Sequence, residues 1–171
     1  MSGESLFLSY RSKTKIVYSK IFNLSMGVIH SKIMKLRTIK QIRNLSGRRV
    51  MVRVDFNVPI EKGKVAEDAR LIASLPTIEY LLKKEAKVIL VSHLGRPEGY
   101  DKKLSLAPVA ERLEKLVGKP IKLLKIKRLN DYRDETVDEI KKIKNGEVVM
   151  LENIRFFPDE AKDENNFGKT L

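Results

Sequence analysis

Three arginines, one histidine and an Asp/Asn pair are the polar residues of this chain whose types best suit a specific chemistry. The planar donor fork of arginine matches the oxygen atoms of a phosphate or a carboxylate. Histidine can donate to a phosphate oxygen, and an ionised Asp beside a neutral Asn suits a hydroxyl group. Together these residue types favour a small phosphorylated acid as the ligand. The residues are Asp55, Asn57, Arg70, His93, Arg96 and Arg155.

Most of these residues fall where the hydrophobic pattern predicts that strands end. Short apolar runs bounded by polar or turn residues predict buried strands. The predicted strands are Arg49–Phe56, Lys87–Val91, Ile121–Ile126 and Glu147–Leu151. The Asp/Asn pair ends the first strand, and the histidine with Arg96 follows the second. Glu152, Asn153 and Arg155 follow the fourth.

Apolar residues at spacings of three and four between the strands predict helices. The predicted helices are Asp68–Lys84, one that runs through Leu116 with Ser105 as its N-cap, Glu135–Lys144 and one that begins at Ala161. Pro76 lies inside the first of them, so we expect a kink there or a helix that begins near Ser74. Strands that alternate with helices predict the α/β class, here a three-layer, Rossmann-like parallel sheet with helices on both faces.

In such an open sheet, ligands bind beyond the carboxyl ends of the strands. We call this edge the rim. Arg70 lies in the first turns of the helix after the first strand, so it belongs to the same edge. We therefore expect the six side chains to face one cleft. The sequence has no glycine-rich phosphate loop of the GxGxxG or GxxxxGK[ST] kind, so side chains would hold a bound phosphate.

Each residue also has an ordinary structural interpretation. The Asp/Asn pair could form a turn or cap a helix, and the histidine could be a hydrogen-bonded loop residue. Arg70 could pair on the helix surface with Glu67 or Asp68, and Arg155 could belong to another surface ion pair. Only the joint placement of all six residues on one rim favours the binding site.

Composition limits the other possibilities. The chain has no cysteine and two histidines, which excludes a disulfide scaffold, a thiolate metal site and a cysteine nucleophile. Its net charge of +13 leaves open a second hypothesis, a non-catalytic basic fragment that binds anions or nucleic acid. The sequence has no zinc-finger spacing, RNP-like aromatic pattern or recognition-helix signal, so we expect no specific nucleic-acid partner. No apolar run is long enough for a membrane partner.

Residues 1–33 differ from the rest of the chain. They are rich in serine and basic residues, with one acidic residue, Glu4, and their apolar residues show no clear helical or strand periodicity. We expect a disordered extension or a segment upstream of a true start at Met34. A targeting peptide is the alternative, since transit peptides are basic, rich in serine and poor in acids.

Three motifs in order resemble phosphoglycerate kinase. Arg53–Pro59 (RVDFNVP) is followed by Arg70, then Ser92–Pro97 (SHLGRP) and Leu151–Phe156 (LENIRF). The resemblance covers residues 34–171, which it identifies as part of the N-terminal, phosphoglycerate-binding domain. It implies a cytoplasmic, glycolytic phosphotransferase that acts between 1,3-bisphosphoglycerate and ADP to give 3-phosphoglycerate and ATP.

The resemblance also implies a role for each site residue. Asp55 and Asn57 would contact the glycerate hydroxyl region. His93, Arg96 and Arg155 would help to hold the phosphate that is not transferred. Arg70 would be the catalytic residue, stabilising charge on the transferring phosphoryl group.

Family members are more than twice as long as this chain. The resemblance implies that Mg-ATP or Mg-ADP binds to the missing C-terminal domain, so we expect neither a cofactor-binding nor a metal-binding residue here. It further implies that the complete enzyme is a monomer. We expect the fragment alone to be inactive, because half of a phosphoryl-transfer site lacks most of the required positioning and charge neutralisation.

Overall fold

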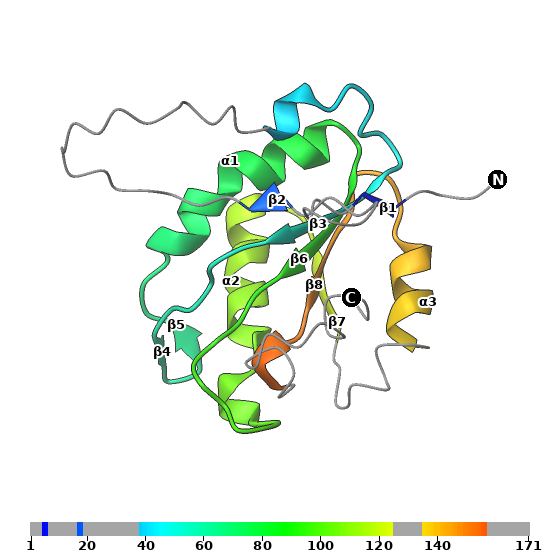
Figure 1. Cartoon of the computed structure of the whole chain (residues 1–171). Helices are drawn as coiled ribbons and strands as arrows, with labels where there is room; N and C mark the ends of the chain where they lie inside the picture. Colours follow the sequence, from blue (N-terminus) through cyan, green and yellow to red (C-terminus); the bar gives the residue numbers. More distant parts are fainter. Residues whose placement is uncertain (1–4, 7–16, 19–37, 125–134, 157–171) are drawn as a thin grey trace, which may run out of the picture.

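Four parallel strands form the centre of a sheet whose spatial order differs from their order along the chain (Figure 1). The computed structural model describes residues 5–6, 17–18, 38–124 and 135–156. The central strands are β3 (Arg49–Arg53), β6 (Lys87–Val91), β7 (Ile121–Leu124) and β8 (Val148–Leu151). The sheet order is β1-β3-β6-β8-β7, with every pair parallel. All four strands lie inside or on the predicted ranges, so the predicted parallel sheet is confirmed.

Two dipeptides from the N-terminal region pair with the outer edge of β3. They are β1 (Ser5–Leu6), which aligns with the start of β3, and β2 (Val17–Tyr18), which aligns with its end. The rest of residues 1–33 lies outside the described residues, as does the helix expected from Ala161. The division of the chain at residue 34 therefore stays a prediction.

Alternating strand residues enter two separate cores, which places helices on both faces of the sheet. One core contains Val50 and Val52 of β3 with the buried faces of α1 (Ala69–Lys83) and α2 (Ala107–Val117). The other contains Met51 of β3 and residues at or near α3 (Glu135–Lys142). Because side chains alternate between the two faces of a strand, this division confirms the three-layer arrangement that Figure 1 shows.

The helix boundaries refine the sequence predictions. Helix α1 begins at Ala69 and continues through Pro76, so the alternative start near Ser74 is wrong. Ile72, an apolar residue of this helix, does not join the core, since 49% of it is exposed. Helix α2 ends at Gly118, whose left-handed φ of 69° suits a glycine C-cap.

Short elements complete the connections. An antiparallel pair, β4 (Ile60–Glu61) and β5 (Lys64–Val65), flanks a turn at Lys62 and Gly63. Within the residues that the structure describes, the 3₁₀ turns are η1 (Ile39–Gln41), η2 (Lys102–Leu104) and η4 (Ile154–Phe156). Within the described ranges, no helix has both the length and the apolar character needed to cross a membrane.

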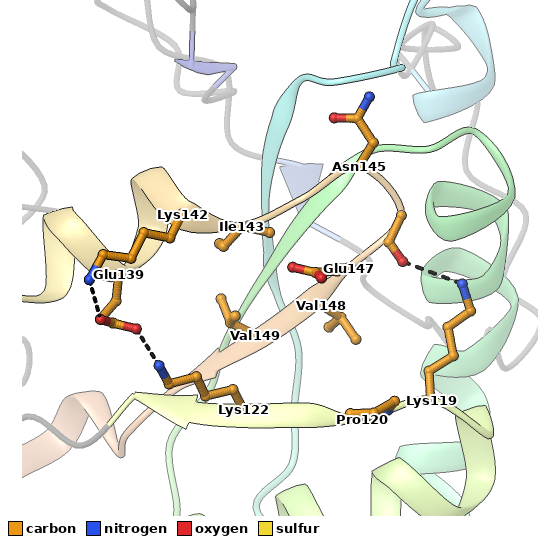
Figure 2. A pocket seen from close by; sticks show the side chains of 11 residues that line it. Lys119, Pro120, Lys122, Glu139, Lys142, Ile143, Asn145, Glu147, Val148 and Val149 are labelled. Carbon is orange, nitrogen blue, oxygen red and sulfur yellow. Dashed lines mark hydrogen bonds and ion pairs between the residues drawn. The ribbon is translucent and has the colours of Figure 1, made fainter.

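A groove of about 690 Å³ lies at the amino ends of β7 and β8, away from the rim (Figure 2). Three lysines contribute to its lining, and the carboxylate of Glu139 on α3 lies between two of them, Lys122 and Lys142. Hydrogen bonds from Lys122 and Lys142 lower the pKa of Glu139 from 4.5 to about 2. The charges of this groove are therefore largely paired among themselves.

Truncation of a core residue on α2 tests the packing. Leu113 is fully buried against the sheet, so Leu113→Ala is expected to lower the free energy of unfolding by about 2–5 kcal/mol. Urea denaturation followed by circular dichroism measures this change. The control is Ile72→Ala on exposed α1 surface, expected to change stability by about 0.5 kcal/mol or less. Equal effects of the two substitutions would contradict the assigned core.

The groove gives a pH prediction. Since the pKa of Glu139 is lowered in the folded chain, the stabilisation from its ion pairs is complete above the ordinary value of 4.5 and is lost as the pH falls to about 2. An NMR titration of the Glu139 side-chain carboxyl measures the pKa directly. Lys122→Gln should move that pKa back toward 4.5. A titration near 4.5 in the unsubstituted chain would contradict the ion-pair geometry.

Candidate anion-binding site at the rim

The structure places all six candidate residues at the carboxyl ends of three neighbouring strands. Asp55 and Asn57 follow β3, His93 and Arg96 follow β6, and Arg155 lies in η4 directly after β8. Arg70 occupies the first turn of α1 and reaches the same edge, as its contact with the β3 loop shows. The strand order brings these loops together because β6 lies between β3 and β8.

Arg70 and Asp55 form an ion pair across the rim. Nη1 of Arg70 donates to Oδ2 of Asp55 at 2.6 Å, and the side chains are 52% and 62% exposed. The alternative partners considered for Arg70 do not apply here, since Asp68 pairs instead with Arg112. Asp55 also accepts from the backbone N–H of Asn57 at 3.2 Å, so it shapes the turn after β3 as well.

Asn57 and Arg155 contact two backbone groups of the same residue, Gly95. The N–H of Gly95 donates to Oδ1 of Asn57 at 2.9 Å, and its carbonyl accepts from Nη1 of Arg155 at 2.9 Å. Gly95 has a left-handed φ of 64°, and a Cβ there would lie 2.9 Å from a methyl carbon of Leu104. Glycine therefore suits both the backbone conformation and the close packing.

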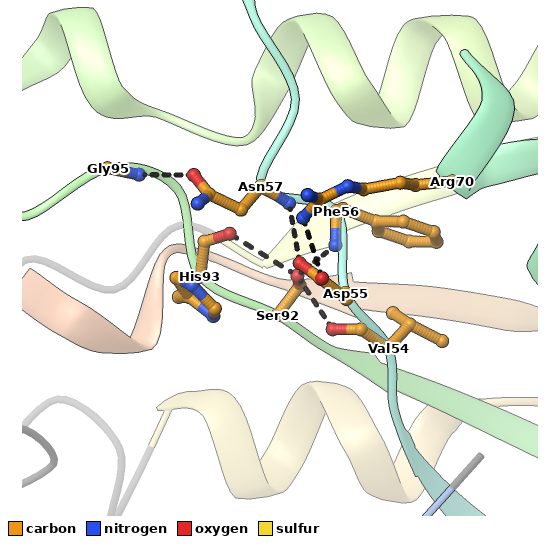
Figure 3. Close-up of polar contacts among 8 residues, drawn as sticks. All are labelled: Val54, Asp55, Phe56, Asn57, Arg70, Ser92, His93 and Gly95. Atoms are coloured by element: carbon orange, nitrogen blue, oxygen red, sulfur yellow. Dashed lines mark hydrogen bonds and ion pairs between the residues drawn. The ribbon is translucent and has the colours of Figure 1, made fainter. Parts of the chain in front are cut away.

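Ser92 joins the loops after β3 and β6 (Figure 3). Its buried hydroxyl donates to the carbonyl of Val54 at 2.9 Å and accepts from the N–H of Phe56 at 3.0 Å. Both partners flank Asp55, so Ser92 fixes the backbone that carries this carboxylate. The pairing of the strands also continues past β3, because the N–H of Val54 donates to the carbonyl of Val91 at 2.9 Å.

His93 and Arg96 complete the second loop of the rim. His93 is half-buried beside Ser92, and its backbone lies next to the Ser92 hydroxyl in Figure 3. Arg96 is exposed, and no carboxylate within the described ranges forms an ion pair with it. Its guanidinium can therefore turn toward an anion at the rim.

Sequence reasoning missed the supporting roles of Ser92, Glu152 and Asn153. All three are buried polar residues directly after strands. Glu152 accepts from the N–H of Leu106 at 2.7 Å and from the hydroxyl of Ser105 at 2.8 Å, which ties the end of β8 to the start of α2. The predicted N-cap at Ser105 is off by one, since the cap is Leu106 and Ser105 instead accepts from the N–H of Ala107.

The rim can bind an anion with side chains. The six candidate residues supply three guanidinium groups, one imidazole, one amide and one carboxylate, that of Asp55, which is paired with Arg70. Arginine forks recognise phosphate and carboxylate oxygens in two-point contacts. Within the described residues, no group of three or more histidine, aspartate or glutamate side chains is arranged to hold a metal ion.

Comparison with known proteins gives relatives for most of the chain. A family model described as phosphoglycerate kinase matches residues 39–171. The phosphoglycerate kinase of Dictyoglomus turgidum is 50% identical over 141 residues, which make up 81% of this chain and 34% of that protein. That of Nostoc punctiforme is 48% identical over 129 residues, covering 75% of this chain and 31% of that protein. This chain therefore spans about a third of the length of these relatives.

Solved structures show the same likeness. Phosphoglycerate kinase from Coxiella burnetii aligns with a TM-score of 0.65 and 34% identity, covering 77% of this chain and 31% of that one. Phosphoglycerate kinase from Pyrococcus horikoshii aligns with a TM-score of 0.63 and 33% identity, covering 73% of this chain and 29% of that one. The family match spans most of the sequence and includes every residue of the rim, and the chain belongs to the phosphoglycerate kinase family.

Proposed function

We propose that this chain supplies the phosphoglycerate-binding site of a phosphoglycerate kinase, a glycolytic phosphotransferase. Such an enzyme moves a phosphoryl group between 1,3-bisphosphoglycerate and ADP, giving 3-phosphoglycerate and ATP. The observation that carries the proposal is the joint contact of Asn57 and Arg155 with Gly95. It links a polar amide and a guanidinium, which come from different strand ends, through the backbone of one loop residue.

The ligand orientation follows from the distribution of charge. Arg155, Arg96 and His93 come from the loops after β8 and β6, and these three would bind the phosphate that is not transferred. The Asp55 carboxylate and the Asn57 amide lie after β3 and would contact the glycerate hydroxyl. A ligand that spans both groups would extend along the rim from β8 toward β3.

Arg70 is assigned to the reacting end of the ligand. Its contact with Asp55 uses Nη1, and arginine carries five N–H donors, so further donors could serve a ligand oxygen. A guanidinium at this end would stabilise negative charge that develops on the transferring phosphoryl group. The role is electrostatic, since arginine stays protonated and does not act as an acid or a base.

The nucleotide is assigned to the part of the enzyme that this chain does not span. Magnesium prefers oxygen ligands, above all carboxylates and phosphates. Among the six candidate residues, the only carboxylate is that of Asp55, which is paired with Arg70. Mg-ATP or Mg-ADP thus suits a second domain, and closure of the two domains would exclude water from the transfer. The cytoplasmic location and monomeric state of the complete enzyme stay predictions from the family.

Binding of 3-phosphoglycerate tests the proposal. We expect chemical shift changes in NMR spectra of the chain that concentrate at the three loops of the rim. Arg155→Ala is expected to weaken the affinity by about tenfold or more, because it removes a charge-assisted contact with the phosphate. Arg70→Ala should weaken it as well, through the carboxyl end of the ligand.

Arg43→Ala is the matched control, since Arg43 is an exposed arginine that precedes β3 at the opposite end of the sheet. It removes the same positive charge and should leave the affinity nearly unchanged. If Arg43→Ala and Arg155→Ala weakened binding equally, general charge attraction would explain it, and the assigned site would be wrong.

Turnover by this chain alone is expected to be undetectable. Phosphoryl transfer depends on positioning and charge neutralisation from both substrates, and half of a site supplies little of either. A coupled assay for ADP formation from MgATP and 3-phosphoglycerate measures this rate. Any turnover that Arg70→Ala abolished would contradict the assignment of the nucleotide to another domain.

A further inference from the structure

We propose that Asn153 is a positioning residue of the phosphoglycerate site, an inference that rests on the function proposed above. Its side-chain amide fixes the loop after β6 relative to η4. The loop carries Gly95, and Gly95 in turn contacts Asn57 and Arg155. Asn153 thus controls the relative placement of two ligand-binding groups without contacting the ligand.

The amide of Asn153 is fully used. Its Oδ1 accepts from the N–H of Leu94 at 3.2 Å and from the N–H of Arg155 at 3.1 Å. Its Nδ2 donates to the carbonyl of Leu94 at 2.7 Å and to that of Leu104 at 2.9 Å. An amide has two donors and one oxygen with two lone pairs, so these four contacts satisfy every position. The same four contacts fix which side-chain position of Asn153 holds the oxygen and which holds the nitrogen.

Burial separates this role from ligand binding. Asn153 is 0% exposed, so its amide is closed off from a ligand at the rim. The amide instead contacts three backbone segments, which are the β6 loop at Leu94, η2 at Leu104 and η4 at Arg155. Two of these segments carry residues assigned to the phosphate.

The contacts form a closed path through the site. Asn153 holds the backbone of Arg155, and the guanidinium of Arg155 returns to the carbonyl of Gly95 at 2.9 Å. Gly95 follows Leu94, which Asn153 holds on both its N–H and its carbonyl. A shift of the amide would therefore move both ends of the Arg155 side chain relative to one another.

Glu152 keeps the path anchored to the fold. Its carboxylate, 2% exposed, accepts from the N–H of Asn153 at 2.8 Å and from the N–H of Leu106 at 2.7 Å. Leu106 is the N-cap of α2, where a negative charge is favourable. The backbone of Asn153 is thereby held between β8 and the start of a packed helix.

Asn153→Asp tests the inference with a side chain of the same shape. The aspartate keeps the two acceptor contacts but lacks the donors for the carbonyls of Leu94 and Leu104. We expect 3-phosphoglycerate affinity, measured by NMR titration, to fall about tenfold, as when the group that orients a binding side chain is lost. The matched control is Asn145→Asp, which makes the same change on the exposed surface before β8.

A double-mutant cycle distinguishes positioning from general destabilisation. The effect of Asn153→Asp on affinity is measured alone and in an Arg155→Lys background, which keeps the charge but not the planar fork. We expect a clearly smaller effect in that background, because Asn153 acts through Arg155. Equal effects in both backgrounds, or unchanged affinity in a folded variant, would overturn the inference.

Circular dichroism and urea denaturation first establish that the variants fold. If the Asn153→Asp variant does not fold, Asn153→Ser replaces it in the same double-mutant cycle, since serine brings no buried charge. The unsubstituted chain keeps the two proposals distinct. Failure of that chain to bind 3-phosphoglycerate contradicts the proposed function, whereas binding that Asn153 variants leave intact contradicts only the positioning role.

Discussion

Three polar side chains, Ser92, Glu152 and Asn153, are enclosed at the carboxyl edge of the sheet, where an unpaired donor or acceptor would cost about 1–3 kcal/mol. Each of them has at least one partner in the backbone of a neighbouring loop. The loops must therefore approach closely enough to meet these groups. Parallel strands alone do not fix the positions of their terminal loops relative to one another. The need to satisfy the buried hydrogen-bonding groups, more than the exposed charges, therefore determines the shape of the rim.

The consequence is a division between rigid and adaptable parts of the rim. Asn57 and Arg155 are bound to backbone atoms of Gly95, whose left-handed conformation and packing against Leu104 restrict its movement. Arg70 is bound only to an exposed carboxylate, and such surface pairs contribute about 0–1 kcal/mol. The first group is arranged before a ligand arrives, and Arg70 can exchange its partner at small cost.

Much of the fold could be predicted because local patterns agree with the tertiary structure. The apolar run of β6 and the turn residues around it determine a buried strand with little ambiguity. Pro76 was harder to place, because a proline removes a donor but helix packing decides whether the helix continues. The placement of Leu106, not Ser105, as the cap depends on a carboxylate from a strand end 46 residues away, which no local pattern contains.

The candidate site divides in the same way. The rule that ligands bind beyond the carboxyl ends of parallel strands was enough to select the six exposed or half-buried residues. It could not assign the supporting roles of Ser92 and Asn153, because a buried polar residue acquires its role from partners that only the folded chain brings near. Sequence also suggested Glu67 and Asp68 for Arg70, whereas the structure selects Asp55, 15 residues away across the β4–β5 turn.

The pairing of Asp55 with Arg70 bears on how a strongly basic chain can hold an open anion site. The three arginines of the rim repel one another in the absence of a ligand, and the net charge of +13 adds to that repulsion. Asp55 offsets part of it at the end of the rim where Arg70 would otherwise stand without a counter-charge. An anion bound at the proposed site would add negative charge beside the three guanidinium groups. The selectivity of the proposed site would then rest on the spacing of its cationic groups, and the buried contacts of Ser92 and Asn153 help to fix the loops that carry them.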